Sequence, residues 1–254
     1  SSDLYRVFLM IKIKHKDDHV RISAAVTDFA DSLGYCQYKI PLSIKGVKGV
    51  KSEALTQGHM AHLEEEVFEQ EHVKLEPVTV QHIMDAKKDV EFAREGVFSV
   101  FQIPFEFSSK NILVTLHGRI DKIMRVGSTL LVEDDKFTTN PSSYDKKTEP
   151  YPGQMLQVLT YLNSLYSTKW SNNPNDWFEL PHEQKRWQIR ICDSRTREPY
   201  KIFSDYENTD AQRFLHQSLR TFASVAAGID EPVHHNSKSK CNACNLKNFC
   251  DFRI

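Results

Sequence analysis

The sequence predicts an α/β fold with a mixed sheet flanked by helices. Three observations carry this prediction. Helical patterns fill the first part of the chain, three strand patterns then follow one another directly, and two further helices alternate with one more strand before a cysteine-rich tail. The three consecutive strands are expected to be neighbours in a meander, so the sheet is not wholly parallel. The chain is long enough for one sizeable domain, and we assign residues 1–254 to it.

The first part of the chain has three segments with the apolar spacing of helices, which are residues 20–36, 55–72 and 79–96. The first helix is expected to start near Ser23, and Gly96 is a suitable stop for the third. On the second helix, the apolar side is expected to carry Met60, Leu63 and Val67.

Alternating apolar residues, many of them β-branched, predict four strands, which are residues 97–107, 111–126, 129–137 and 185–195. Two later segments have the helical pattern, which are residues 153–167 and 210–228. Pro152 fits the first turn of one of these helices, and Gly228 is a suitable end for the other.

The second and third predicted strands form a hairpin that carries many charges. Gly127-Ser128 between them suits a two-residue type II′ turn. In the register that this turn sets, Asp121 faces Asp134, and Lys136 lies beside Asp134 because alternate residues share a face. Opposed carboxylates repel each other, so a cation is expected between them. The simpler alternative is a solvated face with loose ion pairs.

Polar residues on two helices are candidates for the same site. Gln154, Gln157 and Tyr161 share one helix face directly after the hairpin, although surface glutamines on an amphipathic helix are the alternative. His62 follows Gly58 by four residues on an earlier helix. A helical histidine is commonly structural, but a neutral imidazole would add a nitrogen ligand to an oxygen-rich metal site.

Three of the five cysteines are close together in the tail, spaced as Cys241-x2-Cys244-x5-Cys250. An odd number of cysteines argues against a disulfide framework, and this spacing indicates a bound metal or cluster. A fourth ligand must come from elsewhere. Cys36 would complete a four-thiolate site of the iron–sulfur kind, whereas His234 or His235 would complete a zinc site. The spacing does not decide between them.

Composition narrows the class of protein further. The formal net charge is −1, so a nucleic-acid site has to be a local basic patch. No apolar run approaches the roughly 20 residues that span a bilayer, and the first residues are too polar for a secretory signal. We expect the reducing interior of a cell as the location, with Cys192 as a packing residue on a strand.

Six ordered pieces of the chain resemble the RecB-like branch of the PD-(D/E)XK nucleases. Within that branch they resemble the members with an iron–sulfur cluster, the CRISPR-associated RecB-like exonucleases and exonuclease V. The pieces are Cys36 after a Ser-led helix, "GHMAH" with His62, "GRID" with Asp121, "DDK" with Asp134 and Lys136, "QVLTY" with Gln157 and Tyr161, and the cysteine tail. One departure is Phe137, where the family often has a small hydroxyl residue.

The resemblance implies a restriction-endonuclease-like core and a role for each matched residue. It implies a catalytic Mg²⁺ or Mn²⁺ held by the side chains of His62, Asp121 and Asp134 and by the backbone carbonyl of Asp135. Lys136 would orient the attacking water, with Gln157 and Tyr161 supporting the site. It further implies a [4Fe–4S] cluster that joins the two chain ends through Cys36, Cys241, Cys244 and Cys250.

The implied activity is metal-dependent hydrolysis of DNA, as an exonuclease on single-stranded ends, with possible protein partners in DNA repair. Two alternatives stay open. One is trimming of DNA for CRISPR spacer acquisition, together with integrase partners. The other is a non-catalytic, cluster-bearing DNA-binding subunit. The basic residues expected to contact DNA are Lys45, Lys48, Lys51, Lys146 and Lys147. The aromatic residues expected to stack on unpaired bases are Tyr35, Tyr38 and Tyr144.

Overall fold

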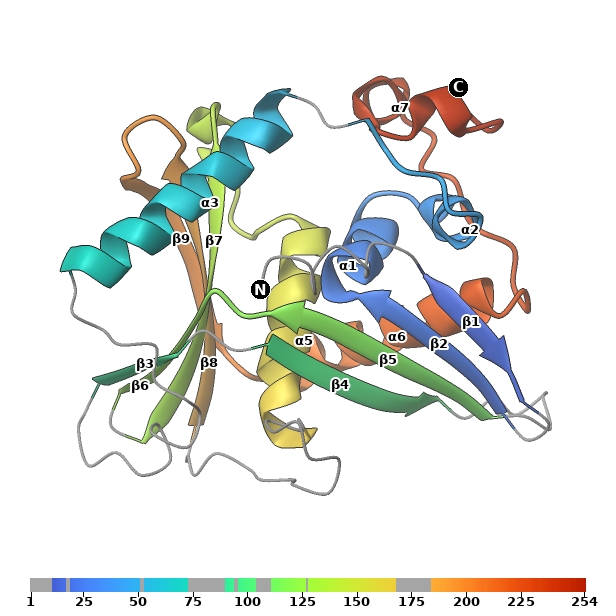
Figure 1. Cartoon of the computed structure of the whole chain (residues 1–254), viewed down its shortest axis with the longest axis horizontal. Coiled ribbons are helices and arrows are strands. Elements are labelled where there is room, and N and C mark those ends of the chain that lie inside the picture. Colours follow the sequence, from blue (N-terminus) through green and yellow to red (C-terminus); the bar gives the residue numbers. More distant parts are fainter. Residues whose placement is uncertain are drawn as a thin grey trace.

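The computed structural model describes residues 11–16, 19–50, 53–72, 90–93, 96–103, 111–126, 128–167 and 184–254. Its strands form two sheets rather than one central sheet (Figure 1). The first has the order β1-β2-β5-β4, with bounds Lys12–His15, His19–Ala25, Asn111–Arg119 and Gly96–Ile103. The second has the order β3-β6-β7-β8-β9, with bounds Val90–Ala93, Lys122–Val126, Thr129–Thr138, Gln184–Asp193 and Pro199–Tyr206.

Both sheets are mixed, which confirms the predicted α/β class. In the first sheet β2 and β5 are parallel, and in the second β7 and β8 are parallel, while the other pairs are antiparallel. Parallel neighbours need a crossover connection, and between β7 and β8 the helix α5, Pro152–Ser167, lies in that connection. Figure 1 shows α5 between the two sheets, where it packs against β4, β7 and β8.

The predicted single strand over residues 111–126 is wrong, because β5 ends at Arg119 and β6 begins at Lys122 in the other sheet. The apolar side chains explain the break. Leu116 and Ile120 are buried at even positions, whereas Ile123 is buried at an odd position. Because alternate residues of a regular strand share a face, the buried apolar residues move to the opposite face at this point, where the chain passes from one sheet to the other. The bend between β5 and β6 contains Asp121.

The predicted helix over residues 20–36 is wrong in its first part, which is strand β2, and helix α1 covers only Val26–Gly34. Val20, Ile22 and Ala24 are buried while Arg21 is exposed. This alternation suits a strand between two neighbours, which here are β1 and β5. Burial in the sheet therefore overrode the helical propensity of the segment.

Three further strands differ from the prediction. Residues 90–93 of the predicted helix 79–96 form β3, and the part of that helix before them lies outside the described residues. The strands β1 and β9 were not predicted. Both are edge strands with mostly exposed side chains, and in β9 Phe203 is buried while Ile202 is 52% exposed. A sequence pattern of apolar alternation is weak when so few residues are buried.

The two later helices agree with the prediction. At the start of α5, Pro152 occupies the first turn, and the side chain of Gln154 accepts a hydrogen bond from the backbone N–H of Tyr151. Helix α6 spans Thr209–Ala226 and begins at Asn208, whose side chain accepts a hydrogen bond from the N–H of Ala211. The chain turns away at Gly228, where φ is +72°.

The core is continuous from the first sheet to the helices. Phe29 of α1 and Phe222 of α6 are fully buried and meet edge to face, with ring centroids 5.3 Å apart. Helix α1 crosses α5 so closely that a Cβ at Gly34 would lie 2.2 Å from the backbone nitrogen of Gly153. Only glycine permits this approach, which fixes α5 beside the first sheet.

Helix α3, Glu53–His72, crosses over β7 (Figure 1). The prediction of its apolar side is wrong. Met60, Leu63 and Val67 are 48%, 43% and 51% exposed. The helix instead packs through small residues: Ala61 is fully buried, and the place of a Cβ on Gly58 is 3.5 Å from the carbonyl oxygen of Phe137. This packing brings His62 toward β7.

The tail lies against the segment that follows α1. Helix α2, Lys39–Ile44, lies near helix α7, Lys238–Ala243, and the short η3, Lys247–Phe249 (Figure 1). The N–H of Val50 donates to the carbonyl of Asn245. The N–H of Val233 donates to the side chain of Gln37. In the part of the chain that the structure describes, no helix is long and apolar enough to cross a membrane.

Candidate active site

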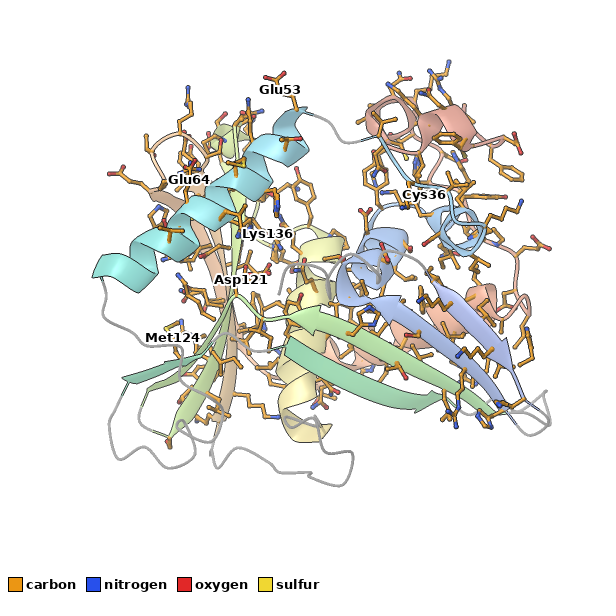
Figure 2. The ribbon with its side chains drawn as sticks, viewed as in Figure 1. Cys36, Glu53, Glu64, Asp121, Met124 and Lys136 are labelled. Atoms are coloured by element: carbon orange, nitrogen blue, oxygen red, sulfur yellow. The ribbon has the colours of Figure 1, made fainter. Side chains whose placement is uncertain are left out.

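The polar residues predicted from the hairpin gather where β5, β6 and β7 meet, beneath α3 and beside α5 (Figure 2). The predicted hairpin register is confirmed, since Val126 pairs with Thr129 and Lys122 with Glu133. The ladder ends there, one residue before Asp121. Gly127 of the predicted turn lies outside the described residues.

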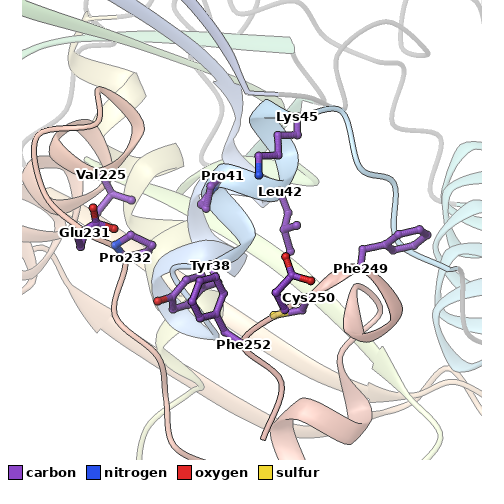
Figure 3. Close-up of a pocket in the computed structure, with 11 residues that line it drawn as sticks. Tyr38, Pro41, Leu42, Lys45, Val225, Glu231, Pro232, Phe249, Cys250 and Phe252 are labelled. Atoms are coloured by element: carbon purple, nitrogen blue, oxygen red, sulfur yellow. The ribbon is translucent and has the colours of Figure 1, made fainter.

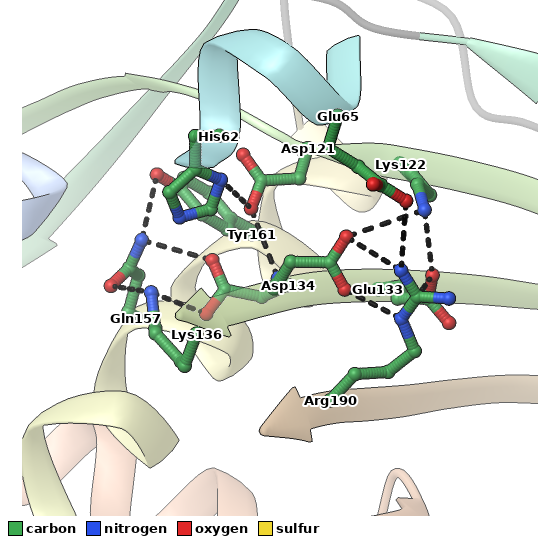
Figure 4. Close-up of polar contacts among 11 residues, drawn as sticks. His62, Glu65, Asp121, Lys122, Glu133, Asp134, Lys136, Gln157, Tyr161 and Arg190 are labelled. Atoms are coloured by element: carbon green, nitrogen blue, oxygen red, sulfur yellow. Dashed lines mark hydrogen bonds and ion pairs between the residues drawn. The ribbon is translucent and has the colours of Figure 1, made fainter. Parts of the chain in front are cut away.

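Asp121 lies in the bend at the end of the ladder rather than in a cross-strand pair. Its Oδ2 accepts a hydrogen bond of 3.1 Å from the backbone N–H of Asp135. This contact holds the Asp121 carboxylate against the backbone of β7, on the side from which Asp134 projects (Figure 4). Because the chain changes sheet at this bend, the Asp121 carboxylate lies next to β7 just beyond the last residue pair of the β6–β7 ladder.

A closed set of contacts links β7 to α5. Lys136 Nζ is 2.6 Å from Asp134 Oδ2 and donates to Gln157 Oε1 at 2.9 Å. The amide of Gln157 donates to Asp134 Oδ1 at 3.1 Å and reaches the hydroxyl oxygen of Tyr161 at 3.4 Å. Tyr161 itself is buried against Gly118, where a Cβ would lie 3.0 Å from its ring. Strand β7 and helix α5 are thus joined through one amide and one ammonium.

The Asp134 carboxyl is the most deeply buried acid of the site, with 1% of its surface exposed. Burial raises its pKa from 3.8 to about 7, although the Lys136 ammonium opposes the shift. Its Oδ2 has the ionic contact with Lys136 but no aligned hydrogen bond from any described residue. A buried acceptor of this kind, with a second carboxylate at Asp121, fits a hard divalent cation.

His62 faces this group from α3. Its Nδ1 is 4.0 Å from Asp121 Oδ2, and its ring meets Phe137 edge to face at 4.8 Å. Burial lowers the pKa of His62 despite the neighbouring Asp121 carboxylate, so the imidazole is neutral near pH 7. A neutral imidazole has a free lone pair, which suits a metal ligand.

A second charged group lies on the other side of β7 and was missed from the sequence. The carboxylate of Asp135 takes two hydrogen bonds from Arg190 of β8, at 2.7 and 2.9 Å, and lies 3.3 Å from Lys122 Nζ. Lys122 also pairs with Glu133 at 3.2 Å, and Gln188 donates to Glu133 at 2.6 Å. The signal in the sequence is the placement of these charges at alternate positions of neighbouring strands.

This buried group positions the site. Although burial opposes ionisation of Asp135, the hydrogen bonds from Arg190 and the charge of Lys122 hold its pKa below the ordinary value. Because successive residues of β7 alternate between its faces, the Asp135 side chain is turned away from Asp134. Arg190 also lies 3.9 Å from Glu65, one turn after His62 on α3, so it connects this helix to the sheet.

We expect Arg190→Ala to lower the free energy of unfolding by about 3–5 kcal/mol, because it removes both guanidinium hydrogen bonds from the buried Asp135 carboxylate and leaves Lys122 as the remaining cation of the group. Arg195→Ala is the matched control, since Arg195 is an exposed arginine paired with Asp193, and it should cost about 1 kcal/mol or less. Urea unfolding followed by circular dichroism measures both. Equal effects of the two substitutions would mean that the Arg190 group contributes no more than a surface ion pair.

Comparison with known families identifies the fold of this site. The model of the PD-(D/E)XK nuclease superfamily matches residues 42–251, which is most of the chain. The chain belongs to the PD-(D/E)XK nuclease superfamily. The matched region includes His62, the hairpin and the first turns of α5, so the superfamily assignment covers the residues that meet at the site.

Two solved structures are similar to this superfamily member. A crystal structure of a proposed exonuclease from Eubacterium rectale has a TM-score of 0.45 and 14% identity, covering 91% of this chain and 88% of that chain. A structure of LHK-Exo in complex with dAMP has a TM-score of 0.39 and 13% identity, covering 81% and 88%. A search of curated sequences finds no match. The superfamily assignment rests on the family model alone.

The basic residues predicted to contact DNA lie in two places. Lys45 and Lys48 are exposed after α2, while Lys51 lies outside the described residues. Lys146 is exposed in the loop after β7, and Lys147 lies over the ring of Tyr151 at 3.9 Å. Lys45, Lys48 and Lys146 therefore reach solvent, and Lys147 is partly exposed.

The tyrosines predicted to stack on bases are mostly engaged within the protein. The expectation for Tyr144 is wrong, because its ring is 6% exposed and its hydroxyl oxygen accepts a hydrogen bond from Gln154. The hydroxyl of Tyr35 donates to the carbonyl of Lys240. Tyr38 is stacked on Phe252 at 4.0 Å. Packing of the tail therefore uses aromatic surface of Tyr35 and Tyr38 that was expected to stack on bases.

The tail packs beside the segment that contains Cys36, and Cys36 lies well apart from Lys136 (Figure 2). Burial raises the pKa of the Cys36 thiol, and the charges of Cys244, Cys250 and Cys241 raise it further, so these three residues lie within electrostatic range of Cys36. Cys192 is fully buried on β8. Cysteines of the tail that lie near Cys36 are suitable ligands for a shared metal or cluster, which binds thiolates.

A cavity of about 200 Å³ adjoins these cysteines (Figure 3). It is lined by Tyr38, Leu42, Phe249, Cys250 and Phe252, with Lys45 among the surrounding residues. Cys250 is the cysteine that lines this cavity, and the charged residues Glu231 and Asp251 also belong to the lining.

Proposed function

We propose that residues 1–254 form one intracellular, metal-dependent deoxyribonuclease domain of the RecB-like branch, acting as an exonuclease on single-stranded DNA ends. The observation that carries the proposal is the contact set between Asp134, Lys136 and Gln157, closed by Asp121 and His62. A buried carboxylate and an ammonium 2.6 Å apart would be costly in a purely structural role. They are useful where phosphate charge develops.

The residues of the chain divide the work of hydrolysis. Asp121, Asp134 and His62, with the backbone carbonyl of Asp135, would hold a Mg²⁺ or Mn²⁺. When bound, such an ion supplies charge to the scissile phosphate and lowers the pKa of a water. The Lys136 ammonium orients the attacking water and stabilises the developing charge. Gln157 fixes both Lys136 and Asp134, and Tyr161 holds Gln157 in turn.

Cleavage assays on the purified chain test the proposal. End-labelled single strands should be shortened only with a divalent ion present, and chelation should stop the reaction. Lack of cleavage with any divalent ion would favour the non-catalytic DNA-binding subunit instead. Trimming for CRISPR adaptation uses the same chemistry, and dependence of cleavage on integrase partners would reveal it.

The preference between the two ions should depend on His62. Mg²⁺ favours oxygen ligands in near-ideal octahedral geometry, whereas Mn²⁺ accepts imidazole more readily. We therefore expect Mn²⁺ to equal or exceed Mg²⁺ as the activator of the wild type, and His62→Asp to shift the ratio of initial rates toward Mg²⁺. His59→Asp, on the exposed side of α3, is the matched control. An unchanged ratio in the His62 variant would place that side chain outside contact with the ion.

The preference for DNA ends should be detectable by comparing linear single strands with covalently closed circles. The near-zero net charge gives no broad surface for gripping duplex DNA, and the lysines after α2 and after β7 form only local groups. We expect linear single strands to be cut faster than blunt duplex or covalently closed single-stranded circles. Gel analysis of equal amounts of each substrate measures this. Equal rates on circles and linear strands would show an endonuclease.

We also propose that Cys36, Cys241, Cys244 and Cys250 hold a [4Fe–4S] cluster that fastens the tail to the segment after α1. The proposal is supported by the approach of these four thiols and by the direct contacts between the two segments. Anaerobically purified protein should carry iron and acid-labile sulfide. Stoichiometric zinc without iron in that preparation would refute the cluster and leave the nuclease proposal standing.

A further inference from the structure

Two adjacent histidines lie among the tail cysteines. The sulfur of Cys36 and one ring nitrogen each of His234 and His235 lie within 4.8 Å of one another. In addition, His234 Nε2 is 3.6 Å from Cys241 Sγ. Such an arrangement allows two roles for the rings. They could bind a single ion together with the thiolates, or they could donate hydrogen bonds to thiolates that are themselves the ligands.

The backbone contacts of the two rings distinguish these roles. Nδ1 of His234 accepts a hydrogen bond from the N–H of Asn236, and Nδ1 of His235 accepts one from the N–H of Ser237, both at 3.1 Å. A neutral imidazole has one acceptor nitrogen and one N–H. Because Nδ1 is the acceptor in both rings, the proton of each neutral ring is on Nε2. The nitrogen that faces Cys241 is therefore a donor without a free lone pair.

Neighbouring rings fix this orientation. His234 lies 4.6 Å from His235, measured between ring centroids. Tyr38 contacts His234 at 5.9 Å, and Tyr35 meets His235 edge to face at 5.8 Å. Moving Nδ1 of the His234 ring away from Asn236 would break this backbone hydrogen bond. The ring of His234 is thus held with its Nε2–H toward the sulfur of Cys241.

We infer that His234 and His235 are positioning residues that donate N–H hydrogen bonds to a four-thiolate site and are not metal ligands. His234 donates to Cys241, and His235 lies beside Cys36. The inference rests on the proposed [4Fe–4S] cluster. Hydrogen bonds to cluster sulfurs stabilise the reduced, more negative state and raise the reduction potential. The histidine pair therefore raises the midpoint potential of the cluster that fastens the tail.

The test compares anaerobically reconstituted proteins at one pH. The variants are His234→Ala, His234→Gln, His235→Ala and, as a control, His216→Ala at an exposed position of α6. Iron and acid-labile sulfide per chain are measured, and the midpoint potential is determined by redox titration followed by electron paramagnetic resonance. All variants should bind iron and sulfide as the wild type does. His234→Ala should have a more negative potential, His234→Gln should retain most of the wild-type value through its amide N–H, and the control should be unchanged.

Two results would overturn the inference alone. If His234→Ala and His234→Gln lose their iron as completely as Cys244→Ala does, His234 is a ligand. If His234→Ala has the wild-type midpoint potential, the hydrogen bond is excluded. A wild type that binds zinc through nitrogen and sulfur, without iron, would overturn this inference together with the cluster. Divalent-dependent cleavage of DNA by the same preparation would still test the nuclease proposal separately.

Discussion

Lys136→Ala is expected to slow DNA cleavage about 10²–10³-fold, the usual effect of removing one group that stabilises charge in a transition state. Asp134→Asn should slow it at least as much, because it removes the buried carboxylate proposed to bind the metal. Both substitutions lie on one side of β7 and leave the Arg190 group untouched. Initial rates on an end-labelled single strand, with saturating Mn²⁺, measure the effect.

The matched control is Lys14→Ala, which removes an exposed lysine from the edge strand β1. It should cleave at the wild-type rate. Thermal unfolding in chelator separates catalytic loss from misfolding. Wild-type turnover in either site variant would remove the active-site assignment.

The Asp134 substitution should also reveal the cost of its buried charge. Because burial raises the pKa of Asp134 from 3.8 to about 7, ionising it weakens the metal-free fold. The contribution of this group to stability is present at low pH and is lost as the pH rises through about 7. When both proteins are unfolded without metal, the free energy of unfolding of the D134N variant should therefore change less than that of the wild type as the pH rises through about 7.

Cys244→Ala is expected to abolish the bound cluster and to lower the free energy of unfolding by about 4–5 kcal/mol. Cys36 and the tail cysteines are about 200 residues apart, and a link across so long a loop strongly restricts the unfolded chain in the chain-entropy model. The protein should be colourless, with a tail that is cut readily by protease. Iron analysis, absorbance and limited proteolysis measure these changes.

Cys192→Ala is the control for loss of a cysteine. Its sulfur is buried on β8 and does not belong to the tail group, so the variant should keep its iron. Full iron content in Cys244→Ala would contradict the proposed ligand set. Unchanged stability after loss of the iron would mean that contacts such as that between Val50 and Asn245 hold the tail without help.

The sequence alone was sufficient wherever a local rule decided the structure. The two-residue connection at residues 127–128 set the hairpin register, so the position of Lys136 beside Asp134 followed from alternation. The first turn of α5 and the end of α6 followed from Pro152 and Gly228. Each of these depends on a few neighbouring residues and is independent of what packs against them.

Only the tertiary structure decided how the strands are divided. The change of sheet at Asp121 arises because buried apolar residues switch from even to odd positions, and each set needs a different partner layer. Likewise, α3 packs through Gly58 and Ala61 and leaves Leu63 exposed, because a close crossing over β7 favours small side chains.

The site shows the same division. The sequence determined which groups it contains, since Asp121, Asp134, Lys136 and Gln157 stand in short segments with regular spacing. It could not supply Arg190, which is 55 residues from its partner Asp135 and reaches it only because β7 and β8 are parallel neighbours. The alternation of apolar and polar residues indicates which face of a strand a side chain is on. It does not identify the partner on the neighbouring strand, because that partner depends on the order of strands in the sheet. The packing of the whole chain sets this order.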